Sequence, residues 1–273
     1  MTLAEKQALA DKIADIAKQA GKMFAETKAT HVTQKSSAAD VVTDMDLKSQ
    51  QFMIQKCAKL LPDSSFLAEE EGRQTIGAGF TWVIDPIDGT TNYMYQYQHS
   101  CVSIALYEHG HALIGVVYNP YLDECFLAVD ECQSTCNGVP IHVSENAMSE
   151  GLVLIGTSPY HKHLADQSFS VFKRLFLAAR DLRRSGSAAL DLCYVASGRA
   201  DAFYEAILQP WDYAAGLLIL QQAGGMTQAD TPDAFTKLQP TGVLCSNAVC
   251  HEDFCRLVQQ DWASGRSSDF HFS

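Results

Sequence analysis

The stretch WVIDPIDGTTN, residues 82–92, places two carboxylates at the end of an apolar, strand-like segment. Asp85 and Asp88 are three residues apart, and Pro86 restricts the backbone between them. Gly89 follows, and a glycine lets the backbone approach a ligand closely. A turn needs only one Asx side chain, so a proline-set turn leaves the second carboxylate unexplained. We therefore interpret this stretch as a strand end that carries ligands.

The residue types in this stretch suit a cation and a phosphate together. Two carboxylates and a backbone carbonyl are the oxygen ligands that Mg²⁺ prefers. If a helical turn begins at Thr90, the free amides of Gly89 and Thr90 would face an anion. Hydrolysis of a phosphate ester uses both elements, because two cations about 3.5–4 Å apart can act on the attacking water and on the leaving oxygen.

The whole chain has 273 residues and a formal charge of −12, which argues against non-specific binding to nucleic acid or to an anionic membrane. It has no apolar run long enough to span a membrane, and charged residues interrupt its first fifteen positions, so we expect neither a membrane segment nor a signal peptide. Nine scattered cysteines indicate reduced thiols and a cytoplasmic protein. A zinc site at Cys245, Cys250, His251 and Cys255 is an alternative, although the spacing matches no standard zinc motif.

Hydrophobic periodicity predicts an α+β protein in which strands and helices are interleaved. Polar residues at 145–150 suggest two halves, 1–146 with most of the metal ligands and 147–263 with Asp212 and the substrate contacts, followed by a mobile tail at 264–273. The residues at 181–184 are either strand or loop. We expect helices over 2–25, 45–61, 164–179, 187–197, 212–223 and 250–262, and strands over 66–67, 81–85, 101–107, 112–118, 124–129, 152–156, 201–204 and 241–246.

Further carboxylates fall at ends of predicted strands or starts of helices, where α/β folds tend to bind ligands. Asp40 and Asp46 lie in DVVTDMD, and Glu69 lies in FLAEEEG. Asp212 opens an apolar helix after Trp211, so it could also be a simple helix cap. Taken singly, Asp40 could be a loop residue and the glutamate run a solvated edge.

Several of these segments together resemble one family. WVIDPIDGTTN resembles the signature of the inositol monophosphatase family, within the lithium-sensitive, magnesium-dependent phosphatase superfamily. KSSAADVVTDMD (35–46), FLAEEEG (66–72) and ADAFYEAILQPWDYAAGLLILQQAGG (200–225) resemble its other conserved segments, in the same order. The resemblance covers roughly residues 5–260 and implies a layered αβαβα sandwich of the sugar-phosphatase type, two to three Mg²⁺ ions and a homodimer.

The resemblance also implies roles for individual residues. The first Mg²⁺ would bind Glu69, Asp85 and the carbonyl of Ile87, the second Asp85, Asp88 and Asp212, and a third, weaker ion would lie near Glu69. The catalytic set would be Thr90 and Asp46, which orient the attacking water, together with Glu69; Thr43 would support the loop. The substrate would contact Gly89, Thr90, Thr91, Gly186, Ser187, Ala188, Glu205 and Asp212.

The residues after the aspartates favour a small polyol substrate. Thr91-Asn92-Tyr93 resembles the inositol-phosphatase branch, so we expect hydrolysis of myo-inositol monophosphate to inositol and phosphate. The alternatives are a related phosphatase acting on fructose 1,6-bisphosphate or 3′-phosphoadenosine 5′-phosphate, and a regulatory protein on the same scaffold. The chain departs from the family at Ala68, often a glycine, and at a third glutamate, Glu71. Arg183 and Arg184 are better explained by a solvated surface or a subunit contact than by substrate binding.

Overall fold

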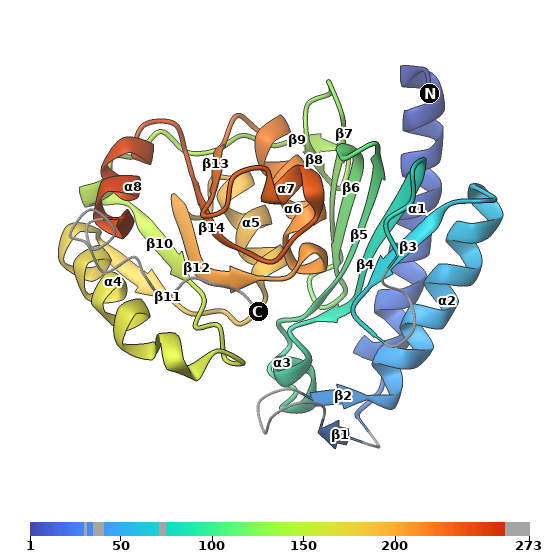
Figure 1. Ribbon diagram of the computed structural model, residues 1–273, viewed down its shortest axis with the longest axis horizontal. Coiled ribbons are helices and arrows are strands. Elements are labelled where there is room, and N and C mark those ends of the chain that lie inside the picture. Colours follow the sequence, from blue (N-terminus) through green and yellow to red (C-terminus); the bar gives the residue numbers. More distant parts are fainter. Residues whose placement is uncertain (30–31, 35–40, 71–74, 260–273) are drawn as a thin grey trace.

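The computed structural model describes residues 1–29, 32–34, 41–70 and 75–259, and they form five layers (Figure 1). Two helices cover the outer face of a seven-stranded sheet. Two more lie between this sheet and a five-stranded sheet, and another pair covers the far side of the smaller sheet. The predicted α+β sandwich of αβαβα type is confirmed.

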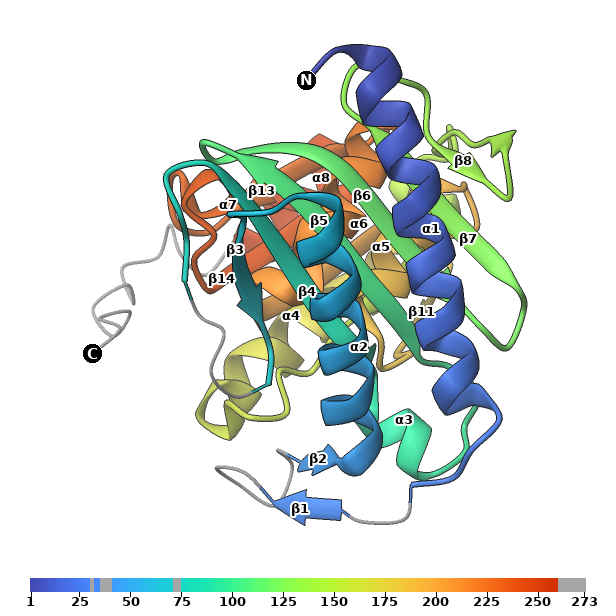
Figure 2. The ribbon, with the colours of Figure 1, turned by 90° about the vertical axis from the view of Figure 1, so that its right-hand side faces the viewer.

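The seven-stranded sheet is built from the first half of the chain. Only the first pair of strands, β3 and β4, is parallel; the pairs that follow are antiparallel. Helices α1 (Leu3–Ala25) and α2 (Asp44–Leu60) lie across its outer face (Figure 2). The strands, in spatial order, are β3 (Ser65–Ala68), β4 (Phe80–Asp88), β5 (Cys101–Glu108), β6 (His111–Asn119), β7 (Glu124–Val129), β8 (Thr135–Cys136) and β9 (Val139–Pro140).

The five-stranded sheet comes from the second half. Its strands are, in spatial order, β11 (Asp181–Arg183), β10 (Leu152–Ile155), β12 (Ala202–Leu208), β14 (Thr241–Ser246) and β13 (Met226–Ala229). Helices α5 (Ala188–Ala196) and α6 (Pro210–Gln222) lie between the sheets, while α4 (Ala165–Ala178) and α8 (His251–Gln259) lie outside. The short elements are β1 (Val32–Gln34), β2 (Val41–Thr43), α3 (Thr90–Met94), η1 (Met148–Glu150), η2 (Lys162–Leu164) and α7 (Ala234–Lys237).

Strand alternation assigns the core residues to three clusters. Trp82 and Ile84 of β4 pack with α1 and α2, whereas Val83 between them packs with α5 and α6. On β12, Phe203 joins the central cluster and Tyr204 the outer cluster with α4 and α8. Both sheets are therefore buried on two faces, which explains the nearly continuous apolar runs of their central strands.

Helix capping agrees with the sequence. Thr2 and Glu5 form the predicted capping box at the start of α1. Thr43 and Asp46 form a second capping box at the start of α2, where the side chain of Thr43 accepts hydrogen bonds from the amides of Met45 and Asp46. This second box fixes Asp46 at the end of the helix that lies nearest to α3.

Some element boundaries differ from the prediction. Strand β12 continues to Leu208 rather than ending at 204, because its last four residues are buried as well. The sequence did not predict β13, an edge strand whose residues MTQA show no apolar alternation, nor the four-residue helix α7. The stretch at 181–184 proves to be mostly strand.

The division at residues 146 and 147 stays a prediction, and the expected tail at 264–273, Asp40 and Glu71 lie outside the described residues. Within the described part of the chain, no helix combines the length and the apolar character needed to cross a membrane.

Candidate active site

A bulge in β4 turns Asp85 and Asp88 to the same side of the sheet. Residues three apart on a regular strand point to opposite faces. Here Asp85 pairs with Ser103 and Asp88 with Cys101, so three steps on β4 oppose two steps on β5. Pro86 lies inside the bulge, where its missing N–H breaks no ladder bond. Both carboxylates therefore face the central helices.

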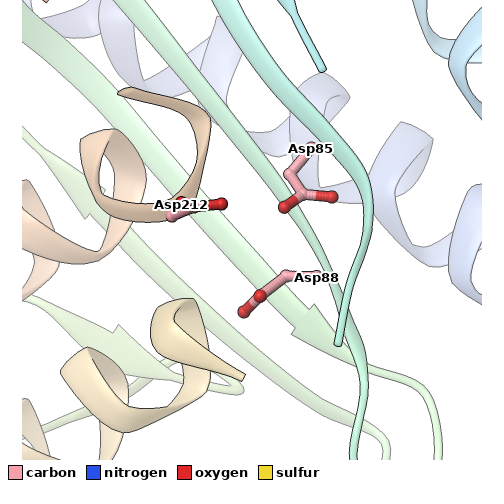
Figure 3. Close-up of side chains that lie close together, drawn as sticks. All are labelled: Asp85, Asp88 and Asp212. Carbon is pink, nitrogen blue, oxygen red and sulfur yellow. The ribbon is translucent and has the colours of Figure 1, made fainter. Parts of the chain in front are cut away.

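Asp212 approaches this pair from the first turn of α6. Pro210 occupies the start of the helix, and Asp212 accepts a hydrogen bond from the backbone N–H of Gln209 over 2.7 Å. Asp212 thus takes part in capping the helix, as the third helical residue of a capping box whose N-cap is Gln209, and it also lies beside the two aspartates of β4. Carboxylate oxygens of Asp85, Asp88 and Asp212 all lie within 4.8 Å of one another, and Figure 3 shows them converging from the strand and the helix.

Burial and mutual repulsion make this arrangement unfavourable without a cation. Burial, then the charges of Glu69 and Asp88, raises the pKa of Asp85 well above its ordinary value. Burial and the charge of Asp88 do the same to the pKa of Asp212. A divalent cation bound by these hard oxygen ligands would remove the repulsion, so the residues fit a metal such as Mg²⁺.

Asp88 is held in place by the start of α5. Its Oδ2 accepts hydrogen bonds from the hydroxyl of Ser187 over 2.5 Å and from the amide of Ala189 over 2.8 Å. Burial raises the pKa of Asp88, and these hydrogen bonds offset part of the effect. Ser187 was expected to contact substrate, and in this structure it positions the carboxylate of Asp88.

Asp85, Asp88 and Asp212, the carboxylate trio, lie in a pocket of about 750 Å³ between the two sheets. Glu69, the residue after β3, lines the same pocket. Glu205 of β12 lies on the opposite wall. Twelve of the thirteen residues predicted for the site line it: Glu69, Asp85, Ile87, Asp88, Gly89, Thr90, Thr91, Gly186, Ser187, Ala188, Glu205 and Asp212.

The thirteenth residue, Asp46, lies behind Thr90. Thr90 Oγ1 is 3.3 Å from Asp46 Oδ1 and 3.0 Å from the carbonyl oxygen of Ile87. The amide of Thr43 donates to Asp46 Oδ2 over 2.8 Å, and the Thr43 hydroxyl donates to the same oxygen. The predicted contact between Thr90 and Asp46 is therefore present, and Thr43 fixes the rotamer of Asp46.

The turn after Asp88 depends on a glycine and on an asparagine. Gly89 has φ +88°, and an added Cβ would lie 3.1 Å from the carbonyl oxygens of Gly186 and His99. Asn92 donates to the carbonyls of His99 and Ser185 over 2.8 and 3.0 Å, so it joins this turn to the loop that precedes α5. Nothing in the sequence predicted this role for Asn92.

The opposite wall is built around Glu205, which is 7% exposed. Burial raises the pKa of Glu205 to about 7, although the amide of Ser158 donates to its Oε1 over 2.6 Å. Arg184 also lines the pocket, whereas Arg183 is outside its lining and pairs with Asp181 over 2.5 Å. Both arginines are exposed, as the surface interpretation held, but Arg184 also lies on the pocket wall.

Other lining residues were missed because no motif marks them. The loop after β10 contributes five of them, and Asp191 follows the expected substrate loop by one helical turn. The missed residues are Met94, Tyr95, Gly156, Ser158, Pro159, Tyr160, His161, Asp191, Ile207, Leu208, Gln209 and Trp211.

The alternative zinc site gains no support from the geometry. Cys255 Sγ lies 3.6 Å from Nε2 of His251, while Cys245 and Cys250 are buried in the protein. Among the residues that the structure describes, Asp85, Asp88 and Asp212 are the one group of three or more potential metal ligands that converge.

Comparisons with known proteins agree with this geometry. The model of the inositol monophosphatase family matches residues 2–263. An inositol-1-monophosphatase from Synechocystis sp. is 36% identical, with 85% of this chain and 81% of that protein aligned. A Nus factor SuhB from Xylella fastidiosa is 41% identical over 71% of this chain and 70% of that protein.

Solved structures show the same fold. The extragenic suppressor protein suhB from Bartonella henselae is 30% identical with a TM-score of 0.85, covering 93% of this chain and 99% of that one. The inositol monophosphatase from Anabaena is 32% identical with a TM-score of 0.80, covering 93% and 96% of the two chains. The chain, a phosphoric monoester hydrolase, therefore belongs to the inositol monophosphatase family.

Proposed function

We propose that the protein hydrolyses the phosphate monoester of a small polyol, with myo-inositol monophosphate as the foremost substrate and two to three Mg²⁺ ions as cofactor. The observation that carries this proposal is the pocket that has the trio Asp85, Asp88 and Asp212 on one side and Glu205 on the other. The first side suits a metal-bound phosphate, and the second suits hydroxyl groups, because a carboxylate accepts their hydrogen bonds.

Each part of the site has a task in this proposal. Bound Mg²⁺ supplies charge that neutralises the phosphoryl oxygens and lowers the pKa of a water. Glu69, Asp85, Asp88, Asp212 and the carbonyl of Ile87 would hold the ions. The protein otherwise acts through position and electrostatics, as is usual in phosphoryl transfer.

Thr90 and Asp46 would orient the attacking water. The Thr90 hydroxyl has two acceptors in reach, the carbonyl of Ile87 and Asp46; if the Ile87 carbonyl holds a cation, the one hydroxyl proton would go to Asp46, and the hydroxyl oxygen would accept a hydrogen bond from the water. The water would then keep a lone pair for the attack on phosphorus, and Asp46 would be placed to accept a proton. Gly89, Thr90 and Thr91 would contact the phosphate, and Gly186, Ser187, Ala188, Glu205 and Asp212 the alcohol.

Phosphate release across a substrate panel, with and without Mg²⁺, tests the proposal. We expect fast Mg²⁺-dependent release from inositol 1-phosphate, and inhibition by millimolar Li⁺, with Asp88→Asn as the inactive control. Fast turnover of 3′-phosphoadenosine 5′-phosphate or fructose 1,6-bisphosphate, without turnover of inositol 1-phosphate, would contradict the polyol assignment and identify that compound as the substrate. A structure 25% identical to this chain, an IMPase/NADP phosphatase complexed with Mg²⁺ and phosphate, supports including NADP in the panel.

A regulatory role is the second candidate function. Several relatives that are 37–41% identical carry the name Nus factor SuhB. Because the carboxylates of the site are all present, we propose such a role beside catalysis rather than in its place. Complementation of a deletion strain distinguishes the two: a phenotype restored by the Asp88→Asn variant does not depend on hydrolysis, and one restored only by the wild type does.

The state of the protein in the cell is also proposed. We infer a homodimer, a cytoplasmic location, and a small-molecule phosphate ester as the partner, without nucleic acid or membrane. The dimer rests on the family, and the absence of nucleic-acid binding rests on the charge of −12. Sedimentation equilibrium tests the dimer. A filter-binding assay with RNA and DNA at low salt tests the absence of nucleic-acid binding, and the relatives named Nus factor are the reason to perform it.

A further inference from the structure

Gly156 lies beside Glu205 on the pocket wall that would receive the alcohol. Strands β10 and β12 are parallel, and Ile155 pairs with Tyr204, so the next residue of each strand lies beside the other. An added Cβ on Gly156 would lie 1.8 Å from Oε2 of Glu205 and 2.1 Å from its Cδ. The carboxylate therefore occupies the space that a side chain at position 156 would need.

Ser158 holds the other oxygen of the same carboxylate. Its amide donates to Glu205 Oε1 over 2.6 Å. Its hydroxyl donates to the carbonyl of Ile207 over 3.2 Å and accepts from the amide of Ile207 over 3.1 Å. Ser158 makes these contacts with φ +40°, in the left-handed region that a serine seldom adopts.

These contacts bridge an irregular part of β12. The pairing of β12 with β14 shifts register between Glu205 and Leu208, so Ile207 lies where the ladder is interrupted. Bulges of this kind often redirect a side chain next to an active site. The loop after β10 thus contacts β12 at Glu205, where the regular pairing ends, and at Ile207 inside the irregular part, and these contacts help to hold the Glu205 carboxylate in place.

We propose that Gly156 is a positioning residue for the recognition of substrate hydroxyls: its missing side chain lets Glu205 fold back over the strand and face the pocket. This inference rests on the proposed function, in which Glu205 accepts hydrogen bonds from the alcohol. Gly156 does not have a positive φ, so alanine can adopt its backbone conformation. The carboxylate is the free end of a flexible side chain, so it must yield to the new methyl group.

A double-mutant cycle between Gly156→Ala and Glu205→Ala tests the proposal. The readout is the ratio of kcat/KM for inositol 1-phosphate to kcat/KM for 4-nitrophenyl phosphate, whose alcohol offers no hydroxyl groups to Glu205. We expect Gly156→Ala to lower this ratio about tenfold, the loss of one charge-assisted hydrogen bond. In the Glu205→Ala background, the same substitution should change the ratio less than twofold.

The control is Gly151→Ala at the other end of β10, where the nearest atom to an added Cβ is 3.3 Å away. It should leave the ratio unchanged. An additive effect of Gly156→Ala in both backgrounds, or no effect of it, overturns the inference.

Folding gives a second readout. If Gly156→Ala alone fails to fold, the double variant must recover the wild-type thermal transition, because the clash has been removed; failure of both overturns the inference. Absence of turnover of inositol 1-phosphate by the wild type would instead contradict the proposed function. In that case the double-mutant cycle is measured with the hydroxyl-bearing substrate of the panel that the wild type hydrolyses fastest.

Discussion

The hydroxyl oxygen of Thr90 lies 3.3 Å from Oδ1 of Asp46, although the two residues are 44 positions apart in the chain. Both are buried, and each lies in the first turn of a helix that the fold brings to the edge of the pocket. The capping box with Thr43 holds Asp46 in this position, so a local helix signal also sets the geometry of the proposed catalytic pair.

Removing the hydroxyl of Thr90 should therefore reduce kcat more than it affects substrate binding. General acid–base groups contribute roughly 10²–10⁴-fold to a rate, so we expect Thr90→Ala to lower kcat by at least a hundredfold. Thr90→Ser keeps the hydroxyl and should retain most of the activity. Steady-state kinetics at saturating Mg²⁺ measures both; equal kcat values for Thr90→Ala and the wild type would exclude the proposed role.

Asp88→Asn should abolish most activity and still leave a folded protein. The amide keeps the shape and can accept the hydrogen bonds from Ser187 and Ala189, but it removes one negative charge from the trio. The metal-free variant should be more stable than the metal-free wild type, because the repulsion that raises the pKa of Asp212 is smaller.

Calorimetric titration with Mg²⁺ and thermal unfolding in EDTA check these two effects. Mg²⁺ at a hundred times its Kd should stabilise the wild type by about 2.7 kcal/mol, and the variant less. A variant with wild-type Mg²⁺ affinity would contradict the assignment of Asp88 as a ligand.

Much of this site could be predicted from the sequence, because its ligands lie in short motifs. Asp85 and Asp88 are adjacent to a proline and a glycine, and Asp212 follows the Pro210 that starts a helix, so local rules place all three at element ends. The bulge that turns Asp85 and Asp88 to one face has no sequence signal other than Pro86.

The pocket wall opposite the trio was harder to predict. Ser158 and Gly156 lie in a loop with no motif, and their role depends on the parallel pairing of β10 and β12, which are 47 or more residues apart at these positions. The two arginines were hard to tell apart for a similar reason: they look alike in sequence and both are exposed, and only the fold places Arg184 in the pocket lining.

The stability of the metal-free protein should fall as pH rises. The folded-state pKa of Glu205 is about 7 against an ordinary value of 4.5, so the folded state holds its proton more tightly than the unfolded state. This contribution is complete below pH 4.5 and is lost as pH rises through 7, which amounts to roughly 3 kcal/mol. Asp85 and Asp212, whose pKa values are raised as well, act in the same direction.

Urea unfolding in EDTA between pH 5 and 8 measures this dependence. Mg²⁺ should reverse the trend, since it binds the ionised carboxylates and binds them better at higher pH. A metal-free protein that becomes more stable from pH 5 to 8 would show that these carboxyl groups are ionised in the folded state without a cation.

Arg184 and Arg183 form a matched pair for a test of the pocket. Arg184 lines it, and its guanidinium donates to Thr157 Oγ1 over 3.3 Å. Arg183 is bound to Asp181 outside the pocket lining. Arg184→Ala should therefore raise KM for an anionic substrate roughly tenfold, the value of a charge-assisted hydrogen bond, while Arg183→Ala should change it less than twofold. If both substitutions raised KM alike, and sedimentation showed dissociated subunits, the arginines would act through a subunit contact and not through the substrate.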